Sequence, residues 1–458
     1  MKSIWEQSTE MQKANRKLLS GVHHTQVAVV GGGMAGILTA YLLKEAGFQV
    51  TILEADKVGS GQTRGTTAKI TAQHGMIYSH LEKYFGRHGA MLYGTANQAA
   101  IEEYARIIKK EEIDCEFRRC PAYLYALEGE GVKARLERLH HEVELTQALG
   151  IPSDFTTETE LPFAVAGAEV FHNQAQFHPL KFLEYLSKGL EIYEDSLVLE
   201  AKDNCLFTEK GILEAEHIIF TNHFPWMVTP GYYFMRMHQE RSYVLALQME
   251  KQLQGMYRDM EPTGFSFRSY GEYLLLGGCG HRTGENKSGG NYDKLREQAG
   301  KWYPDAKEVM HWSAQDCVTL DHIPYIGYFS HTIPNWYIAT GFGKWGMTGS
   351  MVSAIILRDM ILGGENKWEE IYSPQRKKWN AAMGQLVENM SSAAVNLSKG
   401  VFTFSKKAKQ EKKICRHMGC KLSWNPEEES WDCPCHGSRY SKDGEVMCGP
   451  TQKPLEKR

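Results

Sequence analysis

The sequence predicts a mixed α/β protein with a Rossmann-like nucleotide-binding domain, an α+β domain and a small all-β module near its C-terminal end. Three observations predict this arrangement. A strand, a glycine-rich turn and a helix occupy residues 27–42, and the same order returns at residues 336–350. Five of the ten cysteines lie between residues 415 and 448. The 458 residues are enough for about two to three domains.

The first turn has the G-x-G-x-x-G spacing, at Gly31, Gly33 and Gly36. Gly31 makes a tight turn, Gly33 allows a close backbone approach, and Gly36 allows the helix to pack closely. These three features suit a pyrophosphate bound at a helix N-terminus. A second strand, residues 50–53, ends at Glu54, whose carboxylate can accept a hydrogen bond from a ribose hydroxyl. We therefore predict a dinucleotide site. The alternative is a strand–turn–helix without a ligand.

Residues before Thr25 are expected to form a surface arm. Apolar spacing predicts helices over 97–113 and 132–149 and a third that opens at His178. Strands are expected from residue 191 to residue 221. Alternating patterns in residues 232–318 then predict a mostly antiparallel sheet that carries a substrate pocket.

Glycine, serine and threonine crowd residues 59–69, which we call the hydroxyl loop. The first glycine turn, Glu54 and this loop resemble the flavin enzymes of the D-amino-acid oxidase, glycine oxidase and sarcosine oxidase superfamily. Residues 321–327 and the second turn match the same family in order. The resemblance implies FAD, with a helix dipole beside the flavin ring. It places these residues at the FAD: Gly31, Gly33, Met34, Ala35, Gly36, Glu54, Ala55, Gly61, Thr63, Thr66, Thr67, Gly341, Gly343, Lys344, Gly346 and Met347.

The resemblance covers residues 26–390 and implies a discontinuous FAD-binding domain with a substrate domain made from the intervening segments. The expected FAD-binding segments are 25–110, 165–231 and 320–390. The expected substrate-domain segments are 111–164 and 232–319, followed by a linker, 391–413, and the module, 414–458.

Near the C-terminal end, Cys415 and His417 form a C-x-H box, and Cys433 and His436 form a C-x-x-H box. Thiolates and imidazoles suit iron–sulfur chemistry, and a tetrahedral zinc site is the alternative. The arrangement resembles a Rieske [2Fe–2S] site. That resemblance implies one iron on Cys415 and Cys433 and the other on His417 and His436.

The Rieske resemblance implies three further features. Cys420 and Cys435 would form a disulfide between the cluster loops. Hydroxyls of Ser438 and Tyr440 would hydrogen-bond sulfur and raise the potential toward the upper part of the Rieske range, about −150 to +300 mV. Few residues separate 390 from 415, so we expect a reduced module whose cluster loops pack on the flavoprotein, with the surface around Trp424 and Trp431 covered.

A flavin beside a one-electron cluster predicts an FAD-dependent dehydrogenase that oxidises a C–N bond of an amine or amino acid. Electrons would leave singly for an outside acceptor, a protein or a quinone-like molecule. The alternatives are a reductase component that serves an oxygenase and a non-catalytic redox sensor. Candidates for a catalytic group are Tyr243, His281, His322 and Lys344, although residues of these types more often have a structural role than a catalytic one. His74 is a candidate for a covalent tether to FAD.

The net charge of −3 gives no indication of nucleic-acid binding. The polar N-terminal stretch lacks the apolar core of a signal peptide, and no apolar run is long enough to span a bilayer. The five cysteines outside the C-terminal cluster are scattered and typical of reduced thiols. We therefore expect a cytoplasmic protein without a membrane span.

Overall fold

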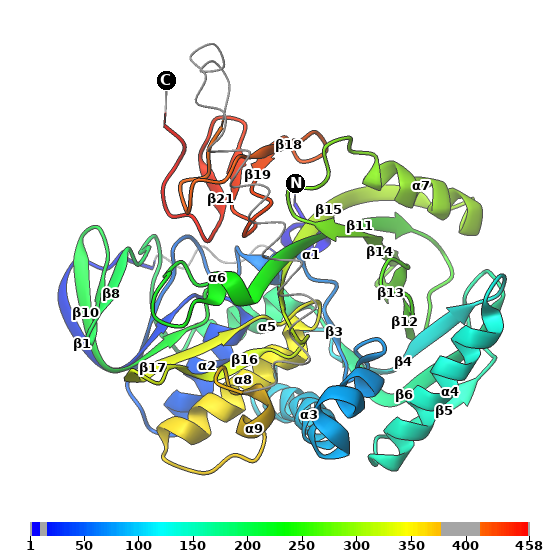
Figure 1. Cartoon of the computed structure of the whole chain (residues 1–458), viewed down its shortest axis with the longest axis horizontal. Coiled ribbons are helices and arrows are strands. Elements are labelled where there is room, and N and C mark those ends of the chain that lie inside the picture. Colours follow the sequence, from blue (N-terminus) through cyan, green and yellow to red (C-terminus); the bar gives the residue numbers. More distant parts are fainter. Residues whose placement is uncertain (1, 10–15, 377–412, 457–458) are drawn as a thin grey trace.

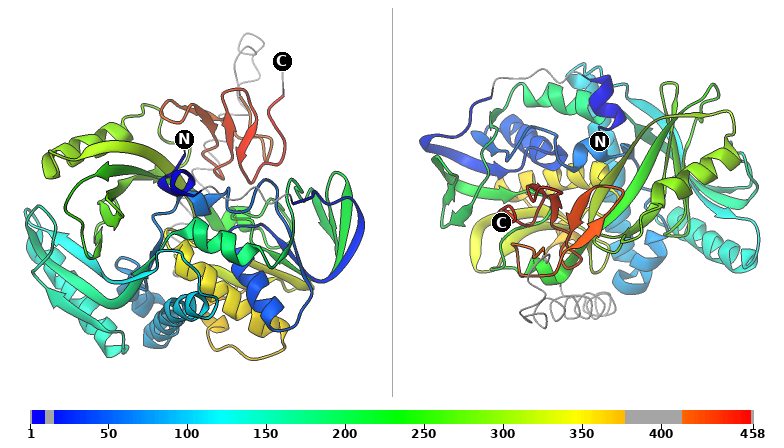
Figure 2. Two further views of the ribbon diagram at one scale, coloured as in Figure 1. Left: turned by 180° about the vertical axis from the view of Figure 1, so that it is seen from behind. Right: turned by 90° about the horizontal axis from the view of Figure 1, so that it is seen from above.

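The computed structural model describes residues 2–9, 16–376 and 413–456. Three sheets and their surrounding helices form two large lobes with a small C-terminal module above them (Figure 1). Both rotated views place the module over the boundary between the lobes (Figure 2). This architecture agrees with the predicted fold class.

The first lobe is built around β1, because its apolar residues 27–30 are buried from both faces of the sheet. β1 pairs in parallel with β10 and β2, and β17 pairs in parallel with β10. The order is β16-β17-β10-β1-β2-β7, and β8 and β9 extend β10. The strands are β1 (Gly21–Val30), β2 (Val50–Leu53), β7 (Glu191–Tyr193), β8 (Glu200–Lys202), β9 (Cys205–Phe207), β10 (Gly211–Phe220), β16 (Tyr325–Ser330) and β17 (Ile333–Thr340).

Helices α2 and α8 pack against each other beside this sheet, and each begins directly after a glycine-rich turn. The helix expected over 97–113 is the second half of the longer α3, which Gly86, with φ of 72°, interrupts. The helices are α1 (Ile4–Ser8), α2 (Met34–Glu45), α3 (Ile77–Lys110), α4 (Val132–Ala148), α5 (Pro179–Ser187), α6 (Tyr233–Arg236), α7 (Asn291–Trp302), α8 (Gly346–Ile361) and α9 (Glu369–Tyr372), with a 3-10 turn at η1 (Gln62–Gly65).

The second lobe holds a nine-stranded sheet in the order β15-β11-β14-β13-β12-β4-β6-β3, with β5 beside β6. Its pairs are antiparallel except for β12 with β4. The strands are β3 (Lys69–Ile70), β4 (Arg118–Leu127), β5 (Ser153–Thr156), β6 (Val165–Gln176), β11 (Met237–Gln248), β12 (Met256–Asp259), β13 (Ser266–Tyr270), β14 (Tyr273–Arg282) and β15 (Lys307–Thr319). β6, which begins at the boundary expected at residue 165, pairs with β4 and β5, so we propose a boundary after Gln176 instead.

The expectation of a surface arm before Thr25 is wrong for α1. Trp5 is fully buried in an edge-on contact with His178 and Tyr270. Its indole Nε1 donates to the carbonyl of Thr66, at 2.6 Å. The N-terminal helix therefore packs under the hydroxyl loop as part of the core.

The C-terminal module, residues 413–456, contains a four-stranded antiparallel sheet. Its small core consists of four cysteines, Cys415, Cys420, Cys433 and Cys435, with Leu422, Tyr440 and Leu455. Trp424 lies tilted against Trp431 and is 36% exposed, while Trp431 is partly buried against the module core, so the covering expected around these two tryptophans is incomplete at Trp424. The expected linker, 391–413, lies outside the described residues except at Lys413. The strands are β18 (Ser423–Asn425), β19 (Ser430–Asp432), β20 (Arg439–Ser441) and β21 (Val446–Cys448).

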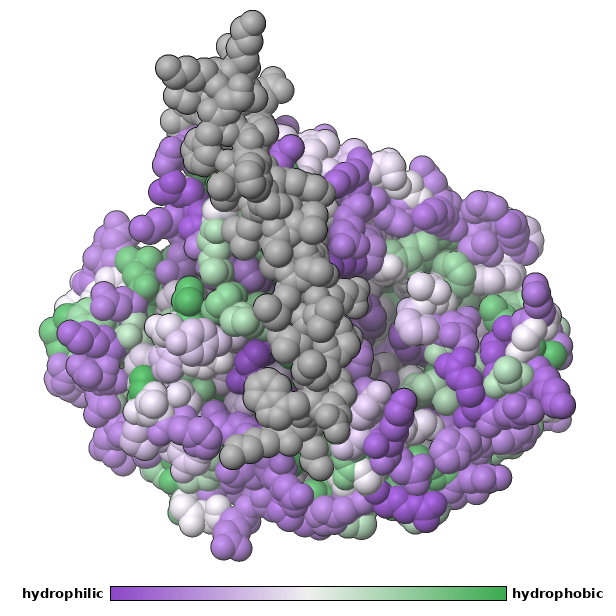
Figure 3. Space-filling model, in the orientation of Figure 1, coloured by the Kyte–Doolittle hydropathy of each residue, from purple (hydrophilic) through white to green (hydrophobic). Residues whose placement is uncertain are grey.

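Hydrophilic residues predominate on the face shown in Figure 3, and hydrophobic residues are scattered among them. Within the described ranges, no helix combines the length and the hydropathy that crossing a bilayer requires.

Candidate active site

The first glycine turn brings the N-terminus of α2 against β1 and β10. A Cβ on Gly36 would lie 1.9 Å from the carbonyl oxygen of Gly31, so only glycine allows this approach. Gly31 has a φ of +111°, in the region that favours glycine. Gly33, the N-cap residue of α2, has no side chain to cap the helix. The N–H of Met34 donates to Thr63, and the next backbone N–H groups of the first turn remain available to an anion.

Glu54 lies at the carboxyl end of β2, beside the turn. Its Oε2 accepts from the backbone N–H of Gly32, at 2.6 Å, and its Oε1 accepts from Asp56, at 2.9 Å. Burial raises the pKa of Glu54. Ala55, next in the chain, is exposed at the same edge, as is Gly61 in the hydroxyl loop.

Buried side chains from distant segments hold the hydroxyl loop. Thr63 Oγ1 accepts from the backbone N–H of Met34, at 3.1 Å, which joins the loop to the start of α2. Trp5 donates to Thr66, and Arg268 donates to the carbonyls of Thr67 and, at 2.9 Å, Ala68. The loop therefore has a fixed backbone beside the first glycine turn.

The second glycine turn leads into α8 and faces a cavity of about 110 Å³. A Cβ on Gly341 would lie 2.3 Å from Thr319 Cγ2, and both Gly341 and Gly343 have positive φ. The cavity is bounded by the hydroxyl loop, the start of α8 and the nine-stranded sheet. Its lining includes Gly65, Thr66, Thr67, Lys69, Ser242, Tyr243, Arg258, Ser266, Gly278, Ala314, Asp316, Lys344, Trp345 and Met347.

A lysine and two carboxylates interact at one side of this cavity. Lys344 Nζ lies 3.3 Å from Glu240 Oε2 and 3.8 Å from Asp316 Oδ2, and it donates to Ser242 Oγ at 3.0 Å. Burial raises the pKa of Asp316 to about 6, against the effect of Lys344. For Glu240, burial also raises the pKa, but His238 and Lys344 outweigh it and hold that pKa below its usual range.

Two further cations line the cavity without a carboxylate partner among the described residues. Lys69 Nζ contacts only hydroxyl oxygens, of Thr67 at 3.3 Å and Ser266 at 3.4 Å. Burial and neighbouring arginines lower its pKa to about 7. The side chain of Arg258 makes no hydrogen bond or close ion pair to a described residue, and its guanidinium lies over Trp345, at 5.6 Å. Burial lowers the pKa of Arg258, although the carboxylates of Asp259, Asp316 and Glu240 attract it at longer range. This side of the cavity therefore carries positive charge.

The four catalytic candidates have different positions. Tyr243 and Lys344 line the cavity. His281 is behind Tyr243, with its Nε2 3.0 Å from the tyrosine hydroxyl. His322 is not part of the lining and contacts His80 edge-on.

His74 is buried under Trp345, which stacks on its ring at 4.4 Å between centroids. Its Nδ1 lies 2.6 Å from the Tyr93 hydroxyl, and its Nε2 lies 2.6 Å from the carbonyl of Thr71. Burial lowers the pKa of His74 to about 3. Both ring nitrogens are thus engaged within the protein, which disfavours a covalent link to FAD.

The two cysteine–histidine boxes converge in the module. The rings of His417 and His436 lie 5.1 Å apart, and the thiols of Cys415 and Cys433 hydrogen-bond each other. Burial lowers the pKa of His417 to about 4 and of His436 to about 3, which keeps both imidazoles neutral. The Nδ1 atoms of both rings are buried and lack a hydrogen-bond partner. Two thiols and two unpartnered imidazole nitrogens fit the ligand set of a Rieske cluster.

A disulfide joins Cys420 and Cys435, as the resemblance implied. The sulfurs of Cys420, Cys433 and Cys435 lie within 4.8 Å of one another, but the disulfide removes two of them as metal ligands. Tyr440 donates to Cys415 Sγ at 3.5 Å, and Ser438 also hydrogen-bonds this thiol.

Comparisons with known proteins agree with both sites. Residues 26–360 match the family model of FAD dependent oxidoreductases, and residues 391–457 match that of the Rieske [2Fe-2S] domain. The chain belongs to the FAD-dependent oxidoreductase family. The protein is an oxidoreductase that binds FAD and a [2Fe–2S] cluster.

Three similar proteins illustrate the range of this family. YhfW of Bacillus subtilis (strain 168), described as a Rieske 2Fe-2S iron-sulfur protein, is 36% identical over 99% of this chain and 97% of its own. Gamma-glutamylputrescine oxidoreductase of Escherichia coli (strain K12) is 22% identical over 75% of this chain and 85% of its own. The crystal structure of glycine oxidase from Geobacillus kaustophilus superposes with a TM-score of 0.64 and 21% identity, over 78% of this chain and 99% of that one.

The residues of this FAD-dependent oxidoreductase fit its cofactors. The glycine cradle at the start of α2 leaves backbone donors for the FAD pyrophosphate, and Glu54 stands where it can meet the ribose. The unpartnered Nδ1 atoms fit the iron–sulfur cluster. Sequence reasoning missed Trp5 and Arg268, which fix the hydroxyl loop, and Arg258, which faces the cavity. The apolar pair Ile4–Trp5 in a polar stretch was a sequence signal for the burial of Trp5. A lone arginine in a strand, such as Arg258 or Arg268, gives no such signal.

Proposed function

We propose that this protein is a cytoplasmic dehydrogenase that oxidises a C–N bond of an amino acid or amine and passes the electrons singly to an outside acceptor. The observation that carries the proposal is the cavity itself. It lies where the hydroxyl loop, the N-terminus of α8 and the nine-stranded sheet meet, and it is lined by unpaired cations beside an acidic group. A small molecule with both charges suits such a lining.

The chemistry divides between the bound groups and the chain. Bound FAD supplies a two-electron acceptor and the cluster supplies a one-electron carrier. Oxidation of the C–N bond removes two electrons and two protons from the substrate and leaves an imine, which water hydrolyses to a carbonyl compound and an amine. The chain binds and orients the substrate and excludes bulk water from the cavity.

We assign binding of a substrate carboxylate to Arg258 and Lys69. The guanidinium of Arg258 is buried without a direct hydrogen bond or close ion pair to any described residue, which is costly, so an anionic ligand group would satisfy it. The Lys344–Asp316 pair also belongs to the lining, and the Asp316 carboxylate can hold and deprotonate a substrate ammonium. An amino acid therefore suits the cavity better than a simple amine.

A panel of amino acids, each paired with the amine that lacks its carboxylate, tests this function. Anaerobic mixing of the full-length holoprotein with a substrate should bleach the flavin first and reduce the cluster afterwards. Cluster reduction by NADH or NADPH, without a response to any amine, would instead support the reductase alternative. A redox-dependent protein partner without turnover would support the sensor alternative.

The Arg258→Met variant tests the carboxylate assignment. We expect kcat/KM for an amino acid to fall by about 10- to 100-fold, since hydrogen bonds to charged groups are worth about 1.5–3 kcal/mol, with little effect on the paired amine. Arg138→Met, which removes an exposed arginine paired with Glu261, is the matched control. An equal loss on both substrates would show that Arg258 does not bind the carboxylate.

A further inference from the structure

Two adjacent strands separate the cavity from the C-terminal module. Successive residues of a strand point to opposite faces. On β15, Ala314 and Asp316 line the cavity, while Gln315 between them contacts the module. On β11, Gln239 and Arg241 contact the module, while Ser242 lines the cavity and Glu240 pairs with Lys344. The β11–β15 pair thus has the cavity on one face and the module on the other.

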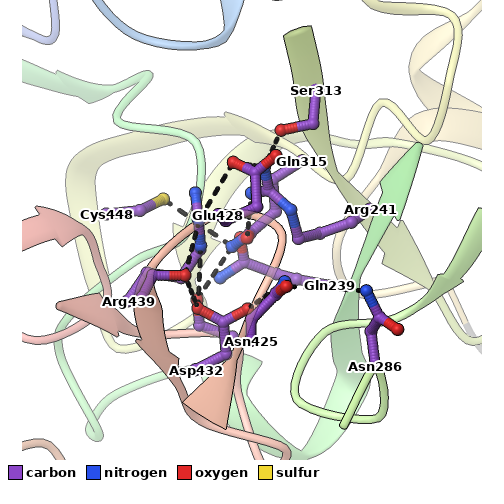
Figure 4. Close-up of polar contacts among 12 residues, drawn as sticks. Gln239, Arg241, Asn286, Ser313, Gln315, Asn425, Glu428, Asp432, Arg439 and Cys448 are labelled. Atoms are coloured by element: carbon purple, nitrogen blue, oxygen red, sulfur yellow. Dashed lines mark hydrogen bonds and ion pairs between the residues drawn. The ribbon is translucent and has the colours of Figure 1, made fainter. Parts of the chain in front are cut away.

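A pair of glutamines supports the second cluster loop, residues 433–438. Gln239 Nε2 donates to the carbonyl of His436 at 2.7 Å, and Gln315 Nε2 donates to the carbonyl of Gly437 at 2.8 Å. The two side-chain amides, one from β11 and one from β15, also hydrogen-bond each other (Figure 4). A Cβ on Gly437 would lie 2.6 Å from Gln239 Cβ, so the loop rests directly on this pair.

A buried ionic network surrounds the glutamines. Arg241 lies 3.0 Å from Glu428 of the module, and their side chains are 3% and 11% exposed (Figure 4). Glu428 also meets Arg439, which pairs with Asp432 at 2.9 Å. Separation of the module from β11 would break this ion pair together with the glutamine contacts to the second cluster loop.

The histidine side of the cluster site faces the flavoprotein. The ring of His436 lies 5.6 Å from that of Phe234 and 6.3 Å from that of Phe224, and the imidazole of His417 hydrogen-bonds the backbone of Trp226. These three aromatic residues belong to the segment that leads into β11. At the open edge of β15, Gln62 of the hydroxyl loop accepts from the backbone N–H of Gln315 at 2.8 Å, and its amide also reaches Cys448 of the module at 4.0 Å. The two cofactor sites therefore share β15 as a neighbour.

We propose that the module stays docked throughout turnover and that Gln239 and Gln315 are positioning residues that fix the second cluster loop against the β11–β15 pair. The proposal deepens the function above and rests on it for its redox role. Two one-electron transfers cross this strand pair for each C–N bond oxidised, and outside acceptors take two electrons from the cluster. Asp316 lines the cavity and the adjacent Gln315 holds the second cluster loop, so the two sites already lie on opposite faces of one strand, and the proposal invokes no domain movement.

Photochemical reduction of the flavin in the full-length holoprotein tests docking without any amine substrate. The rate of subsequent cluster reduction is measured in buffers of increasing glycerol content. A rate that does not depend on viscosity is expected for a docked module, and a rate that falls in proportion to viscosity overturns the proposal. Absence of cluster reduction would overturn the electron relay of the proposed function instead, so the two failures are distinguishable.

Variants Gln239→Leu and Gln315→Leu test the positioning role. Each should slow cluster reduction by about tenfold, the effect of one lost hydrogen bond, and should change the EPR spectrum of the reduced cluster. Gln248→Leu, on the same strand with its amide on exposed Glu272, is the control. Wild-type rates and spectra in both variants would refute the assignment. The viscosity series uses the wild-type protein, so it decides the docking question even if a variant loses its cluster.

Discussion

Tyr440 is fully buried beside Cys415, and its hydroxyl connects the two cluster loops. It accepts from the backbone N–H of Arg416 at 2.8 Å, and its single proton can go to Cys415 Sγ at 3.5 Å or to Thr451 Oγ1 at 2.9 Å. Burial raises the pKa of Tyr440, so the hydroxyl keeps its proton. A donor to a ligand sulfur stabilises the more negative, reduced cluster.

The Tyr440→Phe variant should therefore lower the reduction potential of the cluster. EPR-monitored redox titration of the holoprotein measures the shift, and Tyr193→Phe, at the far edge of the first sheet, should leave the potential unchanged. An unchanged potential in Tyr440→Phe would show that the hydroxyl donates to Thr451 alone.

Trp5 is the second residue with a long-range effect, since its indole fixes the hydroxyl loop from the N-terminal helix. Replacement by alanine should lower the free energy of unfolding by about 3–5 kcal/mol, as for other buried tryptophans, and should weaken retention of FAD. Trp424→Ala removes an exposed indole and is the control. Urea unfolding and release of flavin fluorescence measure the two effects. Wild-type stability in Trp5→Ala would mean that α1 is dispensable.

Among the elements, the βαβ unit at residues 21–53 was predicted together with its turn. The G-x-G-x-x-G spacing is required both by the backbone conformation of the turn and by the close packing of α2. Gly36 explains why: its Cβ would overlap the Gly31 carbonyl. The helix was predicted over 97–113, but α3 begins about 20 residues earlier, at Ile77, and is interrupted at Gly86. The start was missed because sequence signals for helix boundaries are weak. α1 was missed because a five-residue helix gives no periodic pattern.

The turn before β16 is held by a buried ion pair between Asp321 and Arg376. Arg376 binds both carboxylate oxygens, at 2.6 and 2.7 Å. Burial raises the pKa of Asp321, but Arg376 outweighs it, so the folded pKa lies below the usual range. The stability from this pair is therefore present above the unfolded pKa of about 3.9 and is lost as the pH falls through the folded pKa.

Asp321→Asn should cost about 3–5 kcal/mol at neutral pH, because it leaves Arg376 buried without a counter-charge. The difference from wild type should shrink in acid as Asp321 itself becomes protonated. Asp293→Asn, which changes an exposed carboxylate paired with Arg296, is the control. Urea unfolding at a series of pH values measures both. A difference that does not depend on pH would contradict the ion-pair account.

At the scale of the whole molecule, the module contributes to the second lobe through Glu427. Its Oε1 accepts from the backbone N–H of Tyr292 in the first turn of α7, at 2.9 Å, and its Oε2 accepts from Asn291 and Asn286, at 3.2 and 2.5 Å. A carboxylate at this position also interacts favourably with the helix dipole. The module thus caps a helix that belongs to the substrate sheet.

Glu427→Gln should weaken this contact by about 1–3 kcal/mol and increase hydrogen exchange in residues 286–292 and in the module. Glu429→Gln makes the same chemical change two residues away, at an exposed side chain, and should have no effect. Equal exchange in both variants would show that Glu427 does not couple the module to α7.

The sequence by itself determined what depends on local spacing: the glycine turn with Glu54, the second turn, and the two cysteine–histidine boxes, whose resemblance to a Rieske site also implied the disulfide. Each of these lies within a few dozen residues, so spacing alone restricts its geometry. Only the tertiary structure decided how Arg258 faces the cavity, how Trp5 holds the hydroxyl loop, and that Gln239 and Gln315 carry the cluster loop. These contacts join segments that are tens to hundreds of residues apart, and they follow from strand pairing and from which face of a strand a side chain occupies.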